Sequence, residues 1–202
     1  MDEFERWEPR FAVPEYAFGK EPNEFLKSCK NLLPPSGRAL VVADGEGRNG
    51  VWLAEQGLDV LAIDFSPSAQ KKARDLANER RVDVTFVQAD VHDWDYPQSA
   101  FDVVVEIFTQ FSSPTERSLK WAGMRHTLKS GGLLVIQGYT PKQLEYATGG
   151  PKQLENLYTR AILEREFGDF RHLAIVEEER ELREGASHAG ISALIGLTAC
   201  KP

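Results

Sequence analysis

The chain has 202 residues, of which 24 are Lys or Arg and 31 are Asp or Glu, so its formal net charge is −7. This acidic balance argues against a nucleic-acid partner, because such a partner requires a basic surface that displaces the counterions of a phosphate backbone. The 2 cysteines, Cys29 and Cys200, are too few for a disulfide scaffold or a metal cluster, and we expect no metal site.

The N-terminal residues 1–5 are acidic where a secretory signal peptide would be basic and then apolar. No uninterrupted apolar run approaches the ~18–20 residues that cross a bilayer, so we expect a cytoplasmic protein with no membrane partner. Pro22 opens the first predicted helix. We expect one domain over residues 1–202, made of an N-terminal segment (1–36), a core (37–140) and a C-terminal addition (141–202).

A glycine-rich stretch, residues 43–49, follows the apolar run of residues 39–42. Gly45 and Gly47 let the backbone turn sharply and approach a ligand without a Cβ clash. The apolar residues 51–54 then begin a helix, whose first N–H groups are unpaired and favour a polar or anionic ligand. A buried strand, a glycine turn and a helix in this order predict a nucleotide site.

An acid ends the second predicted strand, which covers residues 60–63. Gly45, Gly47 and Gly50 match the dinucleotide fingerprint, and Asp64 follows at the spacing of its acidic residue. A carboxylate there can accept hydrogen bonds from ribose hydroxyls. Both NAD and S-adenosylmethionine carry such a ribose, so Asp64 predicts a nucleoside and leaves the choice of cofactor open.

A helix and a third strand follow. Ser66 is a good N-cap and Pro67 suits the first turn, which predicts a helix over residues 68–80. The third strand is predicted over residues 82–87 and leads to Asp90. A carboxylate at that position lies at the carboxyl edge of the sheet, where it can accept from an adenine amine.

The rest of the chain adds two strands, a helix and a hairpin. Residues 101–108 predict a fully buried strand, and residues 133–137 predict the next one. Thr159 caps a helix that runs to Phe167. Two extended runs, residues 172–183 and 191–200, are joined by a turn-rich segment, which favours an antiparallel hairpin.

Together these segments resemble the class I S-adenosylmethionine-dependent methyltransferases. Five features carry the resemblance in the family's order: the glycine loop, Asp64, Gln88-Ala89-Asp90, Phe101-Asp102-Val103-Val104 and Leu128-Lys129-Ser130-Gly131-Gly132. The flanks are similar to small bacterial methyltransferases of the tellurite-resistance type, at residues 16–23, 148–152 and 184–190. The resemblance implies an α/β fold, with a doubly wound, mostly parallel seven-stranded sheet, Rossmann-like, and a C-terminal antiparallel hairpin.

The activity that the resemblance implies is transfer of a methyl group from S-adenosylmethionine to a small acceptor, such as a chalcogen oxyanion or a thiol. The donor is activated by its own positive charge, so the enzyme mainly aligns nucleophile and methyl in a dry pocket. The N-terminal segment is expected to act as a lid, and the oligomeric state stays open. We expect the cofactor to be bound by Ala43, Asp44, Gly45, Gly47, Asn49, Asp64, Phe65, Ser66, Ala89, Asp90, Val91, Ile107 and Phe108.

Two residues are predicted to act in catalysis. Tyr16, on the expected lid, offers an aromatic face to the sulfonium by cation–π attraction, and its alternative role is packing. His188 lies in a glycine-flanked segment and titrates near neutral pH, so it can accept a proton or orient the substrate. Its alternative role is to cap the hairpin turn.

The glycine loop departs from the family pattern, which has an acid where Val41 stands and a glycine where Ala43 stands. Asp44 is predicted to replace the missing acid and to contact the methionine ammonium. The departure also keeps open a non-catalytic relic. An NAD(P)-dependent oxidoreductase is the other alternative, since Tyr16 and Lys20 match the Tyr-x-x-x-Lys of short-chain dehydrogenases, although they precede the glycine loop.

Overall fold

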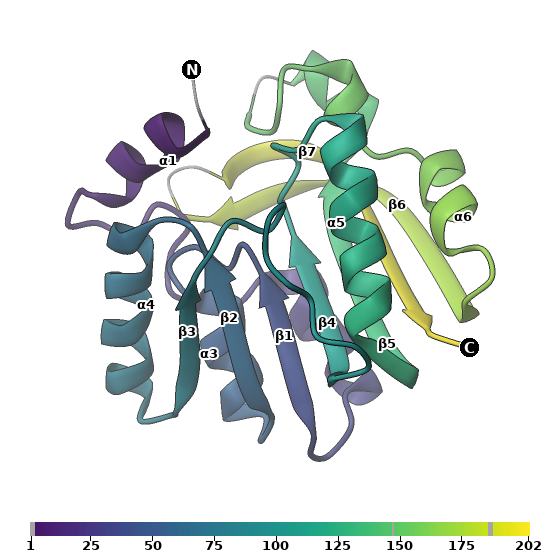
Figure 1. Ribbon diagram of the computed structural model, residues 1–202. Coiled ribbons are helices and arrows are strands. Elements are labelled where there is room, and N and C mark those ends of the chain that lie inside the picture. Colours follow the sequence, from purple (N-terminus) through teal and green to yellow (C-terminus); the bar gives the residue numbers. More distant parts are fainter. Residues whose placement is uncertain (1–2, 147, 186–187) are drawn as a thin grey trace.

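The computed structural model describes residues 3–146, 148–185 and 188–202. In this part of the chain the strands form one 7-stranded sheet in the order β3-β2-β1-β4-β5-β7-β6 (Figure 1). The strands β1 to β5 pair in parallel, and β7 lies antiparallel between β5 and β6. The predicted fold class and the C-terminal hairpin are thus confirmed. The strands are β1 (Arg38–Val42), β2 (Asp59–Asp64), β3 (Val84–Gln88), β4 (Phe101–Ile107), β5 (Leu128–Tyr139), β6 (Arg171–Glu184) and β7 (His188–Cys200).

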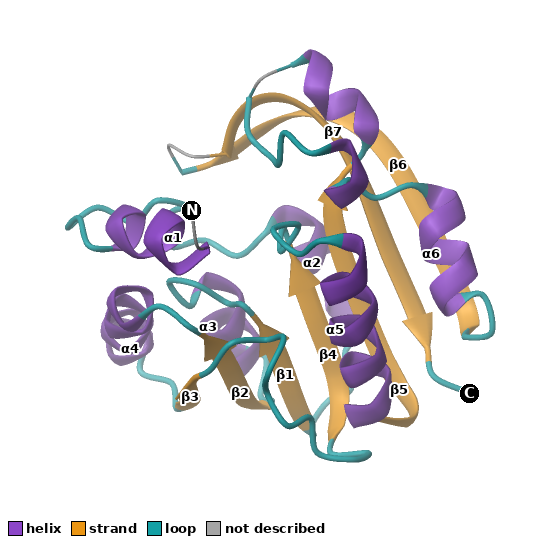
Figure 2. Ribbon diagram, turned by 45° about the horizontal axis from the view of Figure 1, so that its top comes forward, coloured by secondary structure: helices purple, strands orange, loops and turns teal. Residues whose placement is uncertain are grey.

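Helices pack on both faces of this sheet, and α1 lies above the carboxyl ends of the first strands (Figure 2). Among the described residues no helix combines the length and the apolar character that a membrane span requires. The helices are α1 (Glu3–Phe11), α2 (Glu24–Ser28), α3 (Arg48–Glu55), α4 (Pro67–Arg80), α5 (Pro114–Thr127) and α6 (Arg160–Phe167), with 3-10 turns η1 (Cys29–Leu32), η2 (Pro141–Glu145) and η3 (Leu154–Asn156).

The central strand β1 contributes to two apolar cores, one on each face. Leu40 and Val42 pack in the core that contains Trp121 of α5, whereas Ala39 and Val41 pack in the core that contains Trp52 of α3. Successive side chains of a strand point to opposite faces, so a strand covered on both sides is apolar at every position. This arrangement explains the unbroken apolar run that the sequence shows.

The strand register brings the ends of β1, β2 and β4 to one edge of the sheet. Val42 lies opposite Ile63 of β2 and Glu106 of β4. The residues that follow these three positions therefore begin their turns side by side. Ligands of open α/β sheets bind at this edge, outside the carboxyl ends of the strands.

Several element boundaries differ from those predicted. The helix expected to open at Pro22 begins at Glu24, because the side chain of Asn23 accepts from the Leu26 amide at 2.9 Å and acts as the N-cap. Helix α1 was not predicted at all. The third strand begins at Val84 rather than at residue 82, and β5 extends on both sides of the predicted residues 133–137.

Candidate active site

Asp64, the last residue of β2, connects the turns that follow β1 and β2. Its Oδ2 accepts from the Gly45 amide and its Oδ1 from the Ser66 amide, each at 2.8 Å. The residue is only 6% exposed, and burial raises the pKa of its carboxyl to about 6 although both amides favour the charged form. A carboxylate has about four acceptor sites, so both oxygens can still accept from a ligand's hydroxyls.

The glycine loop turns in the left-handed region of backbone space. Ala43 has φ 50° and Gly45 has φ 59°, a conformation that glycine adopts without strain and alanine does not. Gly47 serves another purpose, because a Cβ at that position would lie 2.6 Å from the Cβ of Ala73. Gly47 therefore lets α4 approach the start of α3, and Gly45 faces the site.

Asp44 caps the start of α3 from within the loop. Its carboxylate oxygens lie 3.1 and 3.3 Å from the Gly50 amide, which donates to them. Burial raises the pKa of Asp44 to about 8, and the negative charge of Asp64 adds to the shift. Asp44 thus holds the shape of the loop and, without a cationic ligand, favours its neutral form at neutral pH.

Aromatic rings of the N-terminal segment cover the glycine loop. The ring centroids of Trp7 and Phe11, on α1, lie 5.9 Å apart, and Phe18 lies 6.2 Å from each of them. A Cβ added at Gly45 would lie 3.6 Å from the Phe11 ring. Helix α1 is therefore placed as a cover over the turn that follows β1, above the strand ends (Figure 2).

Polar contacts fasten this cover to the core. Glu8 of α1 accepts from the hydroxyls of Ser66 and Ser68 at the start of α4, each at 2.5 Å. Further along, the Phe18 amide donates to Glu46, whose carboxylate also pairs with Lys72 at 2.8 Å. The N-terminal segment is thus held at the beginning and at the end of its course over the site.

A second buried ion pair connects α3 to the end of β6. The Arg48 guanidinium lies 2.8 Å from the Glu184 carboxylate, and both side chains are nearly inaccessible. Glu184 also accepts from the side chain of Asn23 at 3.1 Å and from the Glu24 amide at 3.2 Å. The contacts join the hairpin, the N-terminal segment and the glycine-loop helix in one network.

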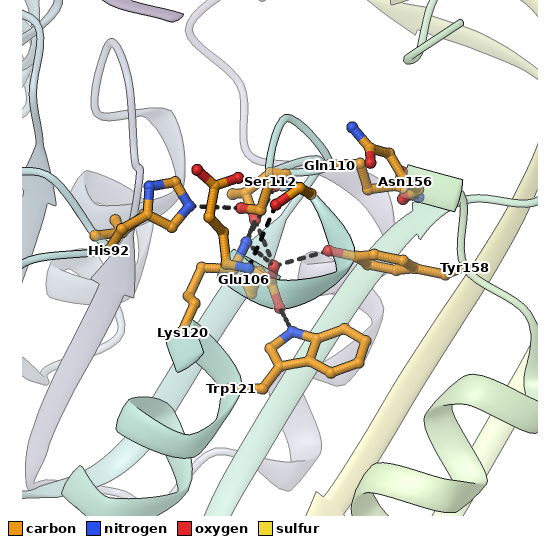
Figure 3. A network of polar contacts seen from close by, with 12 residues as sticks. His92, Glu106, Gln110, Ser112, Lys120, Trp121, Asn156 and Tyr158 are labelled. Atoms are coloured by element: carbon orange, nitrogen blue, oxygen red, sulfur yellow. Dashed lines mark hydrogen bonds and ion pairs between the residues drawn. The ribbon is translucent and has the colours of Figure 1, made fainter. Parts of the chain in front are cut away.

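Glu106, near the end of β4, is the centre of a fully buried polar network (Figure 3). Its carboxylate pairs with Lys120 of α5 at 2.7 Å and accepts from Tyr158 at 2.9 Å and from the Trp121 indole at 2.6 Å. Thr109 donates to the same carboxylate. Although burial raises it, the pKa of Glu106 is lowered on balance, because Lys120 and these donors favour the carboxylate.

Two adjoining cavities lie between the strand ends and the N-terminal segment. The inner cavity has a volume of about 70 Å³ and the outer cavity about 500 Å³. Both are lined by Trp7, Phe18, Phe108 and Phe111. The inner cavity is further lined by Phe11, Ala43, Asp44, Gly45, Arg48, Asn49, Asp64, Phe65, Ile107 and Thr109. The outer cavity is further lined by Arg6, Arg10, Gln110, Tyr139, Gly149, Gly150, Pro151, Lys152 and Gln153.

The structure brings most of the predicted cofactor residues together around the inner cavity: Ala43, Asp44, Gly45, Asn49, Asp64, Phe65, Ile107 and Phe108. It does not place the others on this lining. Gly47 packs on α4, Ser66 caps α4, and the Ala89 amide donates to the Asp64 carbonyl. Asp90 accepts from the His92 amide at 2.9 Å, and Val91 belongs to the core.

The two predicted catalytic residues have different outcomes. Tyr16 lies on neither cavity; its hydroxyl donates to the Lys72 carbonyl at 2.9 Å, and its ring packs beside Val51 and Leu76. This placement gives Tyr16 a packing role and does not support contact with the reacting atoms. The backbone of His188 begins β7, and its side chain lies outside the described residues.

The sequence reasoning missed the contribution of α1. Phe4, Trp7 and Phe11 recur at helical spacing, which is the signal of an amphipathic helix. It also missed Thr109 and Phe111, which follow the end of β4. Their position just beyond a strand end was the available signal, but the predicted cofactor residues ended at Phe108.

A family model described as a methyltransferase domain matches residues 39–132. A demethylmenaquinone methyltransferase of Renibacterium salmoninarum is 30% identical over 129 residues, which are 64% of this chain and 49% of that protein. One of Thermus thermophilus is 31% identical over 106 residues, which are 52% and 48% of the two chains. The chain therefore spans about half the length of the curated relatives it matches.

Solved structures of low sequence identity share the fold. A protein studied for conversion of a disulfide bond into a thioacetal group in echinomycin biosynthesis has a TM-score of 0.77 at 18% identity, covering 99% of this chain and 94% of the other. The N-methyltransferase NodS of Bradyrhizobium japonicum, solved with S-adenosyl-L-homocysteine, has a TM-score of 0.74 at 14% sequence identity, and the match covers 100% of both chains. TehB of Haemophilus influenzae has a TM-score of 0.72 at 15% sequence identity, and the match covers 89% of this chain and 62% of TehB.

These findings agree with the geometry of the strand ends. The matched residues begin in β1 and end in β5, and they include the glycine loop, Asp64 and Glu106. The comparisons support the predicted class of enzyme, a methyltransferase that uses S-adenosylmethionine: residues 39–132 match a family model described as a methyltransferase domain, and the relatives matched by sequence are methyltransferases.

Proposed function

We propose that this protein transfers a methyl group from S-adenosylmethionine to a small cytoplasmic acceptor, a thiol or a chalcogen oxyanion. The observation that carries the proposal is the contact of Asp64 with the Gly45 amide at 2.8 Å, at the side of a cavity lined by aromatic rings. At this point a carboxylate that can accept hydrogen bonds from ribose hydroxyls lies next to a glycine turn that has no Cβ. Both lie beside aromatic ring faces that attract a sulfonium.

The residues of the inner cavity suit the cofactor group by group. Asp64 has acceptor capacity for ribose hydroxyls, and Asp44 becomes a charged partner once an ammonium lies beside it. Phe18 and Phe108 offer ring faces for the positive sulfur. When bound, S-adenosylmethionine supplies a methyl group on a positively charged leaving sulfur.

The N-terminal segment is a lid in this proposal. The inner cavity of about 70 Å³ is well below the ~300–1,000 Å³ of typical small-molecule sites, so the cofactor does not fit while the lid is closed. The aromatic rings of Trp7, Phe11 and Phe18 occupy the space above the glycine loop. Entry of the cofactor therefore requires that α1 moves away and then packs on the bound molecule.

A thiolate or a chalcogen oxyanion is the acceptor class that needs least from the protein. A lone pair of its sulfur or oxyanion centre forms the new bond to the methyl carbon, while the carbon–sulfur bond of the donor breaks and its electron pair returns to that sulfur. No proton has to leave. In the described part of the chain neither cavity is lined by a histidine, which favours such an acceptor.

The names of related proteins suggest other acceptors. Two curated relatives are demethylmenaquinone methyltransferases, and TehB shares the fold. For an acceptor that carries a proton, we propose His188 as the base. Turnover should then rise with pH through roughly 6–7, and His188→Ala should flatten this rise and lower turnover by about 10²–10⁴-fold. An unchanged rate in the variant would assign His188 to the fold.

Calorimetric titration tests the cofactor. S-adenosylmethionine and S-adenosylhomocysteine should bind and NADH should not. At a ligand concentration 100-fold above the dissociation constant, binding should stabilise the folded state by ~2.7 kcal/mol in thermal unfolding. Binding of NADH instead would favour the oxidoreductase, and binding of none of the three would favour the relic.

A further inference from the structure

The outer cavity, defined above, is too large for the simplest acceptors. Its volume of about 500 Å³ lies within the range of sites that hold organic ligands. It shares Trp7, Phe18, Phe108 and Phe111 with the inner cavity, so a molecule bound there lies beside the cofactor site. A bare chalcogen oxyanion of a few atoms would leave most of this space unfilled.

One wall of the outer cavity is a fixed aromatic surface. The rings of Phe108 and Tyr139 are stacked, with centroids 4.7 Å apart and planes at 29°. Phe108 has φ 56°, a strained backbone for a bulky residue, which the surrounding packing holds in place. Tyr139 is 2% exposed, so it supports the Phe108 ring from behind, and the half-buried Phe108 provides the accessible face. The surface suits a flat apolar body, because aromatic pairs favour offset stacking and edge contacts.

The rim of the same cavity is positively charged. Arg6, Arg10 and Lys152 line it, and no Asp or Glu is among its lining residues in the described part of the chain. The guanidinium groups of Arg6 and Arg10 lie over the Trp7 ring, at 5.5 and 5.0 Å from its centroid. In a chain of net charge −7 this rim is a local concentration of positive charge, which favours an anionic substrate.

Among the described residues, an internal ion pair engages one of these three cations and leaves the other two without one. Arg6 lies 3.4 Å from a Glu3 carboxylate that is itself partly exposed. For Arg10 and Lys152 no ion pair with a carboxylate of the described residues is present. By contrast, Lys142 on the preceding turn pairs with Glu179 at 2.7 Å.

Gln110, a neutral polar residue that lines the cavity, is already hydrogen-bonded within the protein. Gln110 donates to the carbonyls of Tyr139 and Asn156, at 2.9 and 3.1 Å, and accepts from the Tyr139 amide. Its amide is therefore committed to the protein. Arg6, Arg10 and Lys152 can thus bind an anionic group in this cavity, whereas the side chain of Gln110 is not available to a ligand.

We propose that the acceptor is an organic anion with a flat apolar body, which lies on Phe108, supported by Tyr139, while its negative group is bound by Arg6, Arg10 and Lys152. This inference rests on the proposed function and narrows its acceptor class. A thiol that carries a carboxylate on an aromatic ring is the simplest molecule of this kind.

Binding of a matched pair of probes tests the charge requirement. 2-Naphthoate and 2-naphthamide share one ring system and differ in charge, and each is titrated into protein saturated with S-adenosylhomocysteine. We expect naphthoate to bind at least about tenfold more tightly, a difference of ~1.4 kcal/mol. The advantage should shrink when the salt concentration is raised, since rim charges are screened.

Variants locate the effect. In Arg10→Gln and Lys152→Gln the advantage of naphthoate should fall severalfold while naphthamide binding is retained, which also shows that the cavity is intact. Lys71→Gln, at an exposed ion pair on α4, is the control and should change neither value. Equal binding of the two probes, binding of neither, or an advantage that survives in the double variant Arg10→Gln/Lys152→Gln would overturn the inference.

The cofactor is tested separately in the same titrations. If S-adenosylhomocysteine does not bind, the proposed function fails, and the two probes are then compared on the unliganded protein. A naphthoate advantage that depends on Arg10 and Lys152 would in that case still support an organic-anion site. If the wild-type protein binds S-adenosylhomocysteine normally but shows no advantage for naphthoate, this inference is rejected and the proposed function stands.

Discussion

Carboxylates are buried at the ends of three neighbouring strands, and their surroundings differ. Glu106 of β4 is fully buried but has a lysine and several hydrogen-bond donors around it, and its pKa is lowered. Asp64 at the end of β2 and Asp44 after β1 have backbone amides as their main donors, and burial raises their pKa values to about 6 and about 8.

The difference separates structure from function. The charge of Glu106 is balanced within the protein, so the network leaves nothing for a ligand to supply. Asp44 and Asp64 border the inner cavity with acceptor capacity that the protein does not use. A ligand with hydroxyls and an ammonium would complete their surroundings, and this is the chemical character of S-adenosylmethionine.

The largest effect should come from removing the partner of Glu106. Lys120→Met leaves a buried carboxylate without its cation, and breaking a buried pair in this way costs ~3–5 kcal/mol of folding free energy. Urea unfolding measures the change. The double variant Glu106→Gln/Lys120→Met should recover much of the loss, because no uncompensated charge remains. A loss of folding free energy below ~1 kcal/mol in the single variant would contradict the conclusion that Lys120 balances the charge of Glu106.

The next effect concerns Asp64 and should appear in binding. Asp64→Ala removes a charged acceptor for ribose hydroxyls, and hydrogen bonds to charged groups contribute ~1.5–3 kcal/mol, so cofactor affinity should fall about ten- to a hundredfold. Calorimetry with S-adenosylhomocysteine measures it. Asp90→Ala is the comparison and should lose less, since Asp90 does not line the inner cavity. A folded Asp64→Ala protein that binds like the wild type would reject the nucleoside assignment.

The raised pKa of Asp44 predicts a pH dependence of the unliganded protein. Its folded-state value of about 8 exceeds the ordinary 3.8, so the folded state holds an extra proton between these values. Stability should therefore fall as pH rises from about 4 to 8, by at most ~1.4 kcal/mol per pH unit from this group. Unfolding curves at pH 6 and 7 measure the slope.

Asp44→Asn isolates this effect, because asparagine keeps an acceptor for the Gly50 amide and cannot ionise. The slope between pH 6 and 7 should flatten in the variant. Binding of S-adenosylmethionine should weaken, whereas binding of adenosine, which lacks the ammonium, should scarcely change. Equal losses for both ligands would show that Asp44 only maintains the shape of the loop.

The sequence identified the parts of the site that are local in the chain. The order of strand, glycine turn, helix and acid places Gly45 and Asp64 at one edge of the sheet, because parallel strands end together. The caps Ser66 and Thr159 were likewise readable, since a helix N-terminus has a local signature. Each of these features depends on a few neighbouring residues.

Features that depend on docking could not be predicted in this way. The packing of α1 on the glycine loop, the role of Tyr16 on α4 and the absence of Asp90 from the inner cavity follow from how distant segments meet. The partner of Glu106 is another example. Lys120 looks in the sequence like an ordinary surface residue of α5, and only the fold shows that it is fully buried.

Glu8 extends the comparison to a carboxylate at the surface of the site, where we expect the smallest effect. No lysine of the described residues pairs with it, and hydrogen bonds from Ser66 and Ser68 lower its pKa on balance although burial raises it. Its stabilising contribution is therefore present above its ordinary pKa of 4.5 and is lost as pH falls through the lowered value. Although Glu8 belongs to α1, its carboxylate lies next to the N-terminus of α4, where a negative charge is favoured by roughly 0.3–1 kcal/mol.

Glu8→Gln keeps an acceptor for one serine and loses the charge, so the attachment of α1 should weaken by about 0.5 kcal/mol at neutral pH. If the lid opens before the cofactor enters, as we propose, S-adenosylhomocysteine should associate about twofold faster, as stopped-flow fluorescence would show. Glu5→Gln, at an exposed position of the same helix, is the matched control and should leave the rate unchanged. If both variants associate at the wild-type rate, the contact of Glu8 with α4 does not hold the lid closed, and the aromatic packing of Trp7 and Phe11 does so alone.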